Sequence, residues 1–356
     1  MIDCQAYLPI LELRRGDTVE SIHHGAIAVV DVHGRLIASY GQPETVTFLR
    51  SSAKPFQLLP FIEHGGQSFF GLSQRELAVM CASHSGTDQH AAVVGDIQAK
   101  VGLLETDLLC GVHIPMDEAT AEALRERKEL PTPNRHNCSG KHTGMLAYAQ
   151  MSGRRLPDLP YISPQHPLQL EIRQTFAEMC GLAPEQIALG IDGCSAPNFA
   201  IPLERAAYAC ARLCDPQAGG ITPPERAAAC GVICSSMMQY PDMVAGPGRF
   251  DTILMQASTG KLISKGGAEG YQMIGLMPGV LSSGAPAVGI AFKIADGDAR
   301  GRARSAVAVE ILRQLGILSA DELQALVGFG PIFPIYNWRN ILVGQGRPVF
   351  ELQHES

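Results

Sequence analysis

Ser51 and Lys54 are the two residues of this chain whose types and spacing point most directly to covalent chemistry. They are three positions apart, so on the first turn of a helix their side chains would share a face and could touch. A serine hydroxyl is a poor nucleophile until a neighbouring base takes its proton, and a desolvated lysine amine can be that base. Pro55 follows directly, which suits the first turn of a helix. The alternative interpretation is that Ser51 is only a helix N-cap.

Two further motifs extend this pair. Ser83 lies in residues 81–86, where we expect a helix to turn into a loop, and Lys265 begins a Lys-Gly-Gly turn at a predicted strand. Penicillin-recognising and class A β-lactamase-like enzymes use the same order of parts: Ser-x-x-Lys, a hydroxyl-bearing loop and a lysine-glycine strand. A cationic Lys265 near Lys54 would lower the pKa of Lys54 by repulsion, which would help Lys54 to accept the Ser51 proton.

A second cluster occurs in two glycine-flanked loops, residues 136–144 and 190–197, each of which we expect to precede a helix. Its candidate metal-binding residues are Cys138, Lys141, Asp192 and Cys194. Two thiolates and a carboxylate are suitable zinc donors, and a deprotonated Lys141, His136 or His142 would complete the set. The spacing matches no common zinc motif, however, and tight turns with buried thiols would explain both loops equally well. The residues alone leave the two interpretations open.

The elements that must position these residues are strands at both ends of the chain and helices between them. Strand character is found at residues 25–40, which form a hairpin pattern, and at 261–265, 272–277 and 287–294. Helices are predicted at residues 87–101, 118–130, 164–180, 196–214, 223–238 and 300–315. This pattern predicts an α+β fold, with an antiparallel sheet from both chain ends and a large central helical insertion. We expect a single domain over residues 1–356, with a sheet part at about 1–50 and 255–356 and a helical part at about 54–250.

Composition and charge indicate to which broad class of protein this chain belongs. The chain has 356 residues, 46% hydrophobic and 18% charged, which is typical of a globular protein with a large core. The formal net charge is −7 and no dense block of Lys and Arg occurs, which argues against nucleic-acid binding. No apolar stretch is long enough to span a bilayer, and residues 1–16 lack the pattern of a signal peptide. We therefore expect a cytoplasmic protein that has no membrane or nucleic-acid partner and whose ten cysteines form no disulfide framework.

Taken together, these motifs resemble the L-asparaginase II family of the Rhizobium etli type. The matching segments are residues 20–25, 50–57, 81–86, 136–144, 190–197 and 265–267, which span most of the chain. The resemblance implies a fold of the serine β-lactamase and glutaminase type and a homodimer. The implied activity is hydrolysis of the small-molecule substrate L-asparagine to L-aspartate and ammonia.

The resemblance also implies a role for each candidate residue. Ser51 corresponds to the nucleophile and Lys54 to its activating partner, while Ser83 and Lys265 correspond to a second serine and a second lysine. The positions that correspond to a zinc site are Cys138, Lys141, Asp192 and Cys194. The implied reaction passes through a serine acyl-enzyme, with zinc as a cofactor that need not be the catalytic electrophile. Three alternatives stay open: a glutaminase or other amidase on the same scaffold, a metallohydrolase that uses zinc-activated water, and a non-catalytic zinc or redox-sensing protein built on Cys138 and Cys194.

Overall fold

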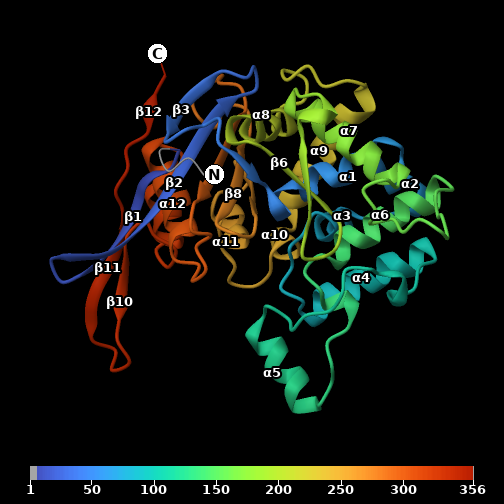
Figure 1. Ribbon diagram of the computed structural model, residues 1–356, viewed down its shortest axis with the longest axis horizontal. Coiled ribbons are helices and arrows are strands. Elements are labelled where there is room, and N and C mark those ends of the chain that lie inside the picture. The colour runs from blue at the N-terminus through green and yellow to red at the C-terminus, as the bar shows by residue number, and fades with distance from the viewer. Residues whose placement is uncertain (1–5, 356) are drawn as a thin grey trace. The chain divides into compact units, whose positions relative to one another are not determined.

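The computed structural model describes residues 6–355, which form two compact units (Figure 1). The sheet unit comprises the chain up to residue 52 together with residues 201–219 and 253 onward, and the helical unit comprises residues 53–200 and 220–252. Residues 1–5 of the predicted sheet part lie outside the described residues. That the two units make up a single domain stays a prediction.

The sheet unit contains an antiparallel sheet whose strands come from both ends of the chain. Its order is β10-β11-β1-β2-β9-β8-β7, and β3 pairs with both β2 and β12. The strands are β1 (Leu8–Arg15), β2 (Thr18–Asp31), β3 (Leu36–Tyr40), β7 (Leu262–Gly266), β8 (Tyr271–Leu276), β9 (Val288–Ile294), β10 (Phe333–Tyr336), β11 (Leu342–Pro348) and β12 (Gln353–His354); the short strand β4 (Val46–Phe48) belongs to the same unit. The longest pairing between the chain ends joins β2 to β9, from Gly25 opposite Ile294 to Asp31 opposite Val288. The predicted α+β fold with a sheet from both ends is therefore confirmed.

Helix α8 packs on this sheet at unusually close range. The helices that contribute to the unit are α8 (Leu203–Cys214), α11 (Phe250–Ala257), α12 (Ala303–Gln314) and α13 (Ala320–Ala325). A Cβ atom at Gly289 of β9 would lie 1.8 Å from the carbonyl oxygen of Ala207, and one at Gly275 of β8 would lie 2.4 Å from Cys214 Sγ. The small residues on both sides are what let the helix approach. The predicted helix at 196–214 was wrong in its first part, because the chain continues as strand β6 (Pro197–Pro202) and turns helical only at Leu203.

In the helical unit, several helices pack around one almost wholly buried helix, α1. Its elements are α1 (Lys54–Glu63), α2 (Gly66–Phe70), α3 (Gln74–Met80), α4 (Asp88–Val101), α5 (Glu118–Arg127), α6 (Ser139–Met151), α7 (Pro167–Cys180), α9 (Pro224–Gln239), α10 (Pro241–Val244) and the strand β5 (Ala188–Ile191). Thr87 caps α4 by accepting a hydrogen bond from the His90 amide. The loop 190–197 joins β5 to β6 in an antiparallel hairpin, so the expectation that it precedes a helix was wrong. The loop 136–144 does lead into a helix, α6.

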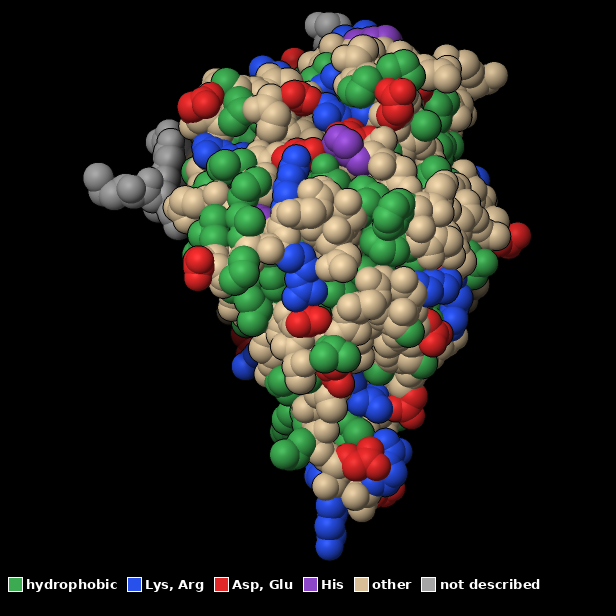
Figure 2. Space-filling view, turned by 90° about the vertical axis from the view of Figure 1, so that its right-hand side faces the viewer, with side chains coloured by type: hydrophobic (Ala, Val, Ile, Leu, Met, Phe, Trp, Pro, Cys, Tyr) green, Lys and Arg blue, Asp and Glu red, His purple; other side chains and the backbone are tan. Residues whose placement is uncertain are grey.

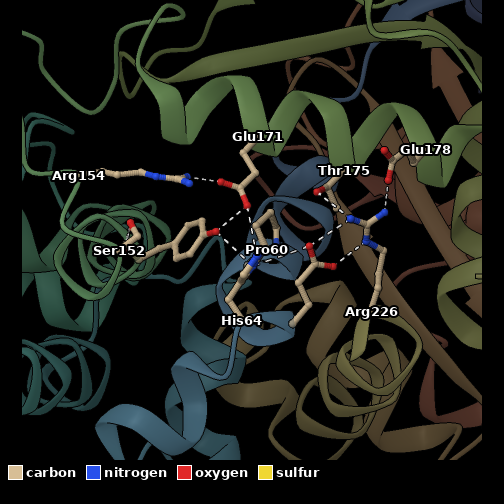
Figure 3. A network of polar contacts seen from close by, with 10 residues as sticks. Pro60, His64, Ser152, Arg154, Glu171, Thr175, Glu178 and Arg226 are labelled. Atoms are coloured by element: carbon tan, nitrogen blue, oxygen red, sulfur yellow. Dashed lines mark hydrogen bonds and ion pairs between the residues drawn. The ribbon is translucent and has the colours of Figure 1, made fainter. Parts of the chain in front are cut away.

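A buried polar network fixes the C-terminal end of α1 (Figure 3). Glu63, its last residue, accepts hydrogen bonds from Arg226 Nε at 2.6 Å and from Arg226 Nη2 at 3.1 Å. The same guanidinium pairs with Glu178 on α7. Removing one partner of a buried ion pair leaves an uncompensated charge, which typically costs about 3–5 kcal/mol. The network therefore ties α1, α7 and α9 together and holds in place the helix that begins at Lys54.

Positively and negatively charged side chains are mixed on one face of the surface. Figure 2 shows Lys and Arg interspersed with Asp and Glu on that face, without one continuous basic patch. Across residues 6–355, none of the helices combines the length and apolar character needed to cross a membrane.

Candidate active site

Three of the chain's seven lysines are buried, and they are the three that the sequence motifs single out. Lys54 and Lys265 are each 1% exposed and Lys141 is 4% exposed. Lysine is almost never fully buried in a folded protein unless its amine is paired, because desolvating a charge is costly. The partners of each amine therefore indicate what that lysine can do.

Lys54 lies at the start of α1, and its amine forms hydrogen bonds with three oxygen atoms. Its Nζ atom lies 2.5 Å from the carbonyl oxygen of Ala82, 2.9 Å from Ser83 Oγ and 3.3 Å from the carbonyl oxygen of Asn137. The helix begins directly after the 3₁₀ turn Arg50–Ala53, and Pro55 occupies its first turn. The structure thus brings the predicted residues Lys54 and Ser83 into direct hydrogen-bonding contact.

The loop that carries Ser83 is held from its other side by the segment after α10. The Ser83 amide donates to the carbonyl oxygen of Val244 at 2.9 Å, and Ser85 Oγ donates to that of Ala245 at 2.9 Å. At Gly246, whose φ is +129°, a Cβ atom would lie only 2.5 Å from Ser85 Oγ. Glycine is therefore required for this close approach, and the segment gives Ser83 a fixed backbone position.

The neighbouring His84 is fully buried, and its hydrogen bonds indicate that its imidazole ring is neutral. Its Nδ1 accepts from the Gly86 amide at 3.1 Å, so the proton must be on Nε2. Nε2 lies 2.8 Å from Ser139 Oγ, which itself donates to the carbonyl oxygen of Asn134. Burial lowers the pKa of His84 well below its usual range, and the stacked His90 and the nearby Lys54 lower it further. His84 is thus a neutral bridge between the Ser83 loop and the start of α6.

In the sheet unit, the segment of Ser51 lies against the strand end that carries Lys265. Ser52 Oγ donates to the carbonyl oxygen of Lys265 at 2.6 Å. A Cβ atom at Gly267 would lie 2.4 Å from the carbonyl oxygen of Leu49, so only glycine allows the two segments to approach this closely. Lys265 Nζ donates to the carbonyl oxygen of Gly266 at 2.9 Å, and Ser51 itself is half-buried. The structure therefore pairs the Ser51 and Lys265 segments in one unit and Lys54 with Ser83 in the other.

The residue before Ser51 has an unusual backbone conformation. Arg50 has φ of +52°, in the left-handed region that residues other than glycine rarely adopt. Its guanidinium lies 3.9 Å from the carboxylate of Glu269, which also has a positive φ of +59°. Such conformations cost on the order of 1 kcal/mol or more and persist where surrounding contacts impose them, commonly at functional sites. The strain is thus located beside the predicted nucleophile and beside the Lys265 turn.

Cys138, Lys141 and Cys194 form a buried cluster in the helical unit. Lys141 Nζ donates to Cys194 Sγ at 2.9 Å. A hydrogen bond from the Cys194 thiol lowers the pKa of Cys138 well below its usual range, and the Lys54 and Lys141 ammonium groups lower it further. Burial alone would lower the pKa of Lys141, but the attraction of the Cys194 and Cys138 sulfur groups and the hydrogen bond to Cys194 outweigh it, so this pKa is raised. The cluster is therefore a thiol–thiolate pair neutralised by an ammonium.

Asp192 is at the edge of this cluster. Its carboxylate contributes to raising the pKa of Lys141, while its Oδ1 accepts from the Gly193 amide at 2.8 Å. Within the part of the chain that the structure describes, no three His, Cys, Asp or Glu side chains lie together as a ready-made metal site. Two thiols and an amine nevertheless converge, and this donor chemistry fits zinc once Lys141 loses its proton. Zinc binding by these residues stays a prediction.

The link between the two clusters was missed by sequence reasoning. Asn137 offers its carbonyl oxygen to Lys54, and the next residue is Cys138. Ser52 was also missed, although it is fully buried and binds the backbone of Lys265. Ser52 follows Ser51 directly and could have been noted on that ground, whereas no sequence signal indicates which backbone carbonyls will face a lysine.

Comparison with known proteins identifies the family. The chain matches the L-asparaginase II family over residues 11–348. A search of curated proteins finds none that matches it. Among solved structures, it is similar to a probable glutaminase from Bacillus subtilis complexed with 6-diazo-5-oxo-L-norleucine, with 11% sequence identity and a TM-score of 0.37 over 82% of this chain and 84% of that chain. A second structure, the covalent complex of the Bacillus subtilis glutaminase YbgJ with 5-oxo-L-norleucine, has 11% identity and a TM-score of 0.33 over 76% of this chain and 80% of that chain. Because the family match covers nearly the whole sequence, the chain belongs to the L-asparaginase II family, a family of amidohydrolases.

Proposed function

We propose that this protein hydrolyses L-asparagine to L-aspartate and ammonia through a covalent serine acyl-enzyme. The observation that carries the proposal is the contact of a fully buried amine, Lys54 Nζ, with the hydroxyl of Ser83 at 2.9 Å. A buried lysine with a serine hydroxyl within reach is the arrangement required for amine-assisted nucleophilic catalysis. The family match supplies the class of substrate, a small molecule with a carboxamide group.

The partners of Lys54 place a hydroxyl next to its amine. The carbonyl oxygens of Ala82 and Asn137 can only accept hydrogen bonds from the amine. The third partner, Ser83, accepts from the amine at 2.9 Å, and its hydroxyl can both donate and accept. Ser83 is therefore the partner through which a proton can pass between Lys54 and a neighbouring group.

In the proposed reaction, the Ser51 oxygen attacks the side-chain carboxamide carbon of asparagine. Its proton passes to the Lys54 amine, directly or through the Ser83 hydroxyl. The tetrahedral intermediate is stabilised by backbone N–H groups, including that of Ser51. Lys54 then returns the proton to the leaving nitrogen, the C–N bond breaks and ammonia departs. Water attacks the resulting β-aspartyl ester by the reverse route and releases aspartate and free Ser51.

Lys265 and Arg50 are proposed to provide positive charge on the sheet-unit side. Lys265 is held by its carbonyl group, through Ser52, at the end of β7, and it is proposed as the second lysine of the reaction. Arg50, and Arg249 in the helical unit, are candidates for the α-carboxylate of the substrate. The carboxylate of Asp192 is a candidate for its α-ammonium group.

Zinc is proposed as a cofactor held by Cys138, Lys141, Asp192 and Cys194. When bound, it would supply a fixed positive charge that orients or polarises the substrate. The carbonyl group of Asn137 connects this cluster to Lys54, because Asn137 precedes Cys138 in the chain. Cys138 and Cys194 would hold the metal as thiolates, and Lys141 would have to give up its proton to join them.

The test is ammonia release from L-asparagine and from L-glutamine by the wild type, by Ser51→Ala and by the matched control Ser68→Ala, whose serine is exposed on α2. We expect Ser51→Ala to lose on the order of 10⁴-fold or more in kcat, and Ser68→Ala to retain full activity. Mass spectrometry of the quenched wild type should find the acyl group on Ser51.

Three results would redirect the proposal. Faster turnover of glutamine would assign a glutaminase on the same scaffold. An acyl group on Ser83 would exchange the roles of the two serines. Full activity in Ser51→Ala, combined with loss of activity on chelation, would favour a metallohydrolase over the acyl-enzyme.

A further inference from the structure

One histidine of the helical unit, His113, has no role in the proposed reaction, although its side chain contacts the active-site loops. It belongs to segment 109–117, which leads into α5, the helix that projects from the rest of this unit in Figure 1. Along the segment, Val112 and Ile114 are exposed, whereas His113 is half-buried and Pro115 is buried. This alternation is typical of an extended chain that packs with one side only. The segment therefore turns the His113 ring toward the helical unit.

Segment 109–117 is fixed at both of its ends by hydrogen bonds within the helical unit. The Leu109 amide donates to the hydroxyl oxygen of Tyr161 at 2.8 Å. The Asp117 amide donates to the carbonyl oxygen of Ser85 at 3.0 Å, and Ser85 belongs to the loop that carries Ser83. The position of the segment is thus defined relative to a residue of the proposed reaction.

Both ring nitrogens of His113 are bonded to the backbone. Nε2 accepts a hydrogen bond from the Asn137 amide at 3.0 Å. Nδ1 lies 2.7 Å from the carbonyl oxygen of Ile114, which can only accept, so Nδ1 carries the proton and the ring is neutral. No nitrogen is left to take a proton from a substrate. The ring is therefore suited to hold the backbone in place and not to act as a base.

The backbone that His113 holds is the one that contacts Lys54. The Asn137 carbonyl oxygen accepts from Lys54 Nζ at 3.3 Å, and the same peptide group contains the Cys138 amide, which donates to His136 Nδ1 at 3.0 Å. The His113 and His136 rings pack together, with their centroids 4.4 Å apart. These amides precede a helix, where backbone N–H groups have no intrahelical partner. Two adjoining imidazoles therefore supply the acceptors that orient this carbonyl group.

We propose that His113 is a positioning residue for Lys54. Its ring fixes the Asn137 amide directly and supports the ring of His136, and together these contacts direct the Asn137 carbonyl oxygen at the Lys54 amine. The expected effect on turnover rests on the proposed function, whereas the contact between His113 and the loop can be measured without it. Segment 109–117 thereby takes part in the arrangement of the active site from outside the sequence motifs.

The test compares two substitutions of His113 that differ in one property. His113→Leu removes the acceptor, whereas the side-chain carbonyl oxygen of His113→Gln can replace Nε2 as the acceptor. In His113→Leu we expect kcat for ammonia release from asparagine to fall about 10–100-fold with KM little changed, because a displaced catalytic group slows the reaction without loss of a substrate contact. His113→Gln should retain most of the wild-type kcat. Hydrogen–deuterium exchange of residues 136–144 should be faster in His113→Leu only.

Val112→Ala is the matched control, because Val112 is exposed on the same segment. It should change neither the kinetics nor the exchange, and circular dichroism verifies the fold of each variant. Wild-type kcat in His113→Leu, or an equal loss in His113→Leu and His113→Gln, would overturn the proposal. A wild type that releases ammonia from neither asparagine nor glutamine would instead contradict the proposed function. Unchanged exchange in His113→Leu would then show that His113 does not hold the loop.

Discussion

Lys54 and Lys141 are two buried lysines in the same unit, each near the start of a helix, yet their surroundings differ in one respect. Lys54 is surrounded by oxygen atoms, two carbonyl groups and the hydroxyl of Ser83. Lys141 instead donates to the sulfur of Cys194, and the Cys138 thiolate lies nearby. Both side chains are at most 4% exposed, so burial does not distinguish them.

The difference shows that partner atoms, more than burial, decide what a buried amine can do. The negative charge of the Cys138–Cys194 pair outweighs the effect of burial on Lys141, whose pKa is raised. The partners of Lys54 include a hydroxyl, with which a proton can be exchanged, although Cys138 also forms a hydrogen bond with this amine. Lys141 is held by sulfur groups and acts as their counter-charge.

The largest expected effect is the loss of activity in Lys54→Met. This change removes the proposed base but keeps a long side chain of similar volume in the buried site. We expect kcat for ammonia release from asparagine to fall by about 10³–10⁴-fold, within the range typical of general acid–base catalysis. Steady-state kinetics of ammonia release, with circular dichroism to verify the fold, measures the effect.

Lys54→Arg is the informative companion variant. Arginine keeps the positive charge and the ability to donate hydrogen bonds, but it cannot act as a base near neutral pH. If Lys54 served only as a structural donor to the two carbonyl groups, Lys54→Arg would retain much of the activity. Comparable loss in both variants supports proton transfer by the lysine.

A smaller and different effect is expected for Lys141→Met. Loss of this ligand and counter-charge should lower the zinc content measured by atomic absorption, and the affinity for zinc should fall by roughly 10–100-fold or more. The rate constant kcat of zinc-loaded protein should fall less than in Lys54→Met, because Lys141 does not exchange the substrate proton in the proposed reaction. Cys138→Ala should likewise lower the zinc content and raise KM more than it lowers kcat.

Proton release adds a readout that is independent of turnover. Because the pKa of Lys141 is raised, zinc binding to the wild type should displace a proton from Lys141. The proton count, measured by isothermal titration calorimetry in buffers of different ionisation enthalpy, should be smaller for Lys141→Met. An equal count in both proteins, or full zinc content in Lys141→Met, would show that this lysine is not a ligand.

Much of the fold was predictable because local patterns and long-range packing agree. The chain-end strands, the Thr87 cap of α4 and the helix after Cys138 follow from periodicity and capping residues. The segment 197–202 was misjudged, because its pairing with β5 overrides a local pattern that continues into a true helix. Residue types indicated the candidate lysines and thiols. The carbonyl oxygens of Ala82 and Asn137 that contact Lys54 are backbone atoms, however. Because every residue has such an atom, the sequence cannot indicate which of them will face a lysine.

His84 extends the comparison, because no thiolate opposes the effect of burial on its pKa. Burial lowers its pKa well below the usual range, and His90 and Lys54 lower it further, so His84 is neutral in the folded protein. The unfolded chain takes up this proton near pH 6.5. Stability from this source is therefore fully present above about pH 6.5 and decreases as the pH falls below it, by at most about 1.4 kcal/mol per pH unit. Stacked His90, whose pKa burial also lowers, adds a contribution of the same sign.

Urea unfolding of the wild type at pH 7.5 and at pH 5.5 should thus show a lower free energy of unfolding at the acidic value, on the order of 1 kcal/mol. In His84→Gln the side-chain amide can still donate to Ser139, but it does not titrate, so the difference between the two pH values should shrink. The carboxylates with lowered pKa, such as Glu76, contribute acid sensitivity only below about pH 4.5, because the ordinary pKa of glutamate is near that value. An unchanged pH dependence in His84→Gln would mean that the histidine beside Ser83 is not the source of this dependence.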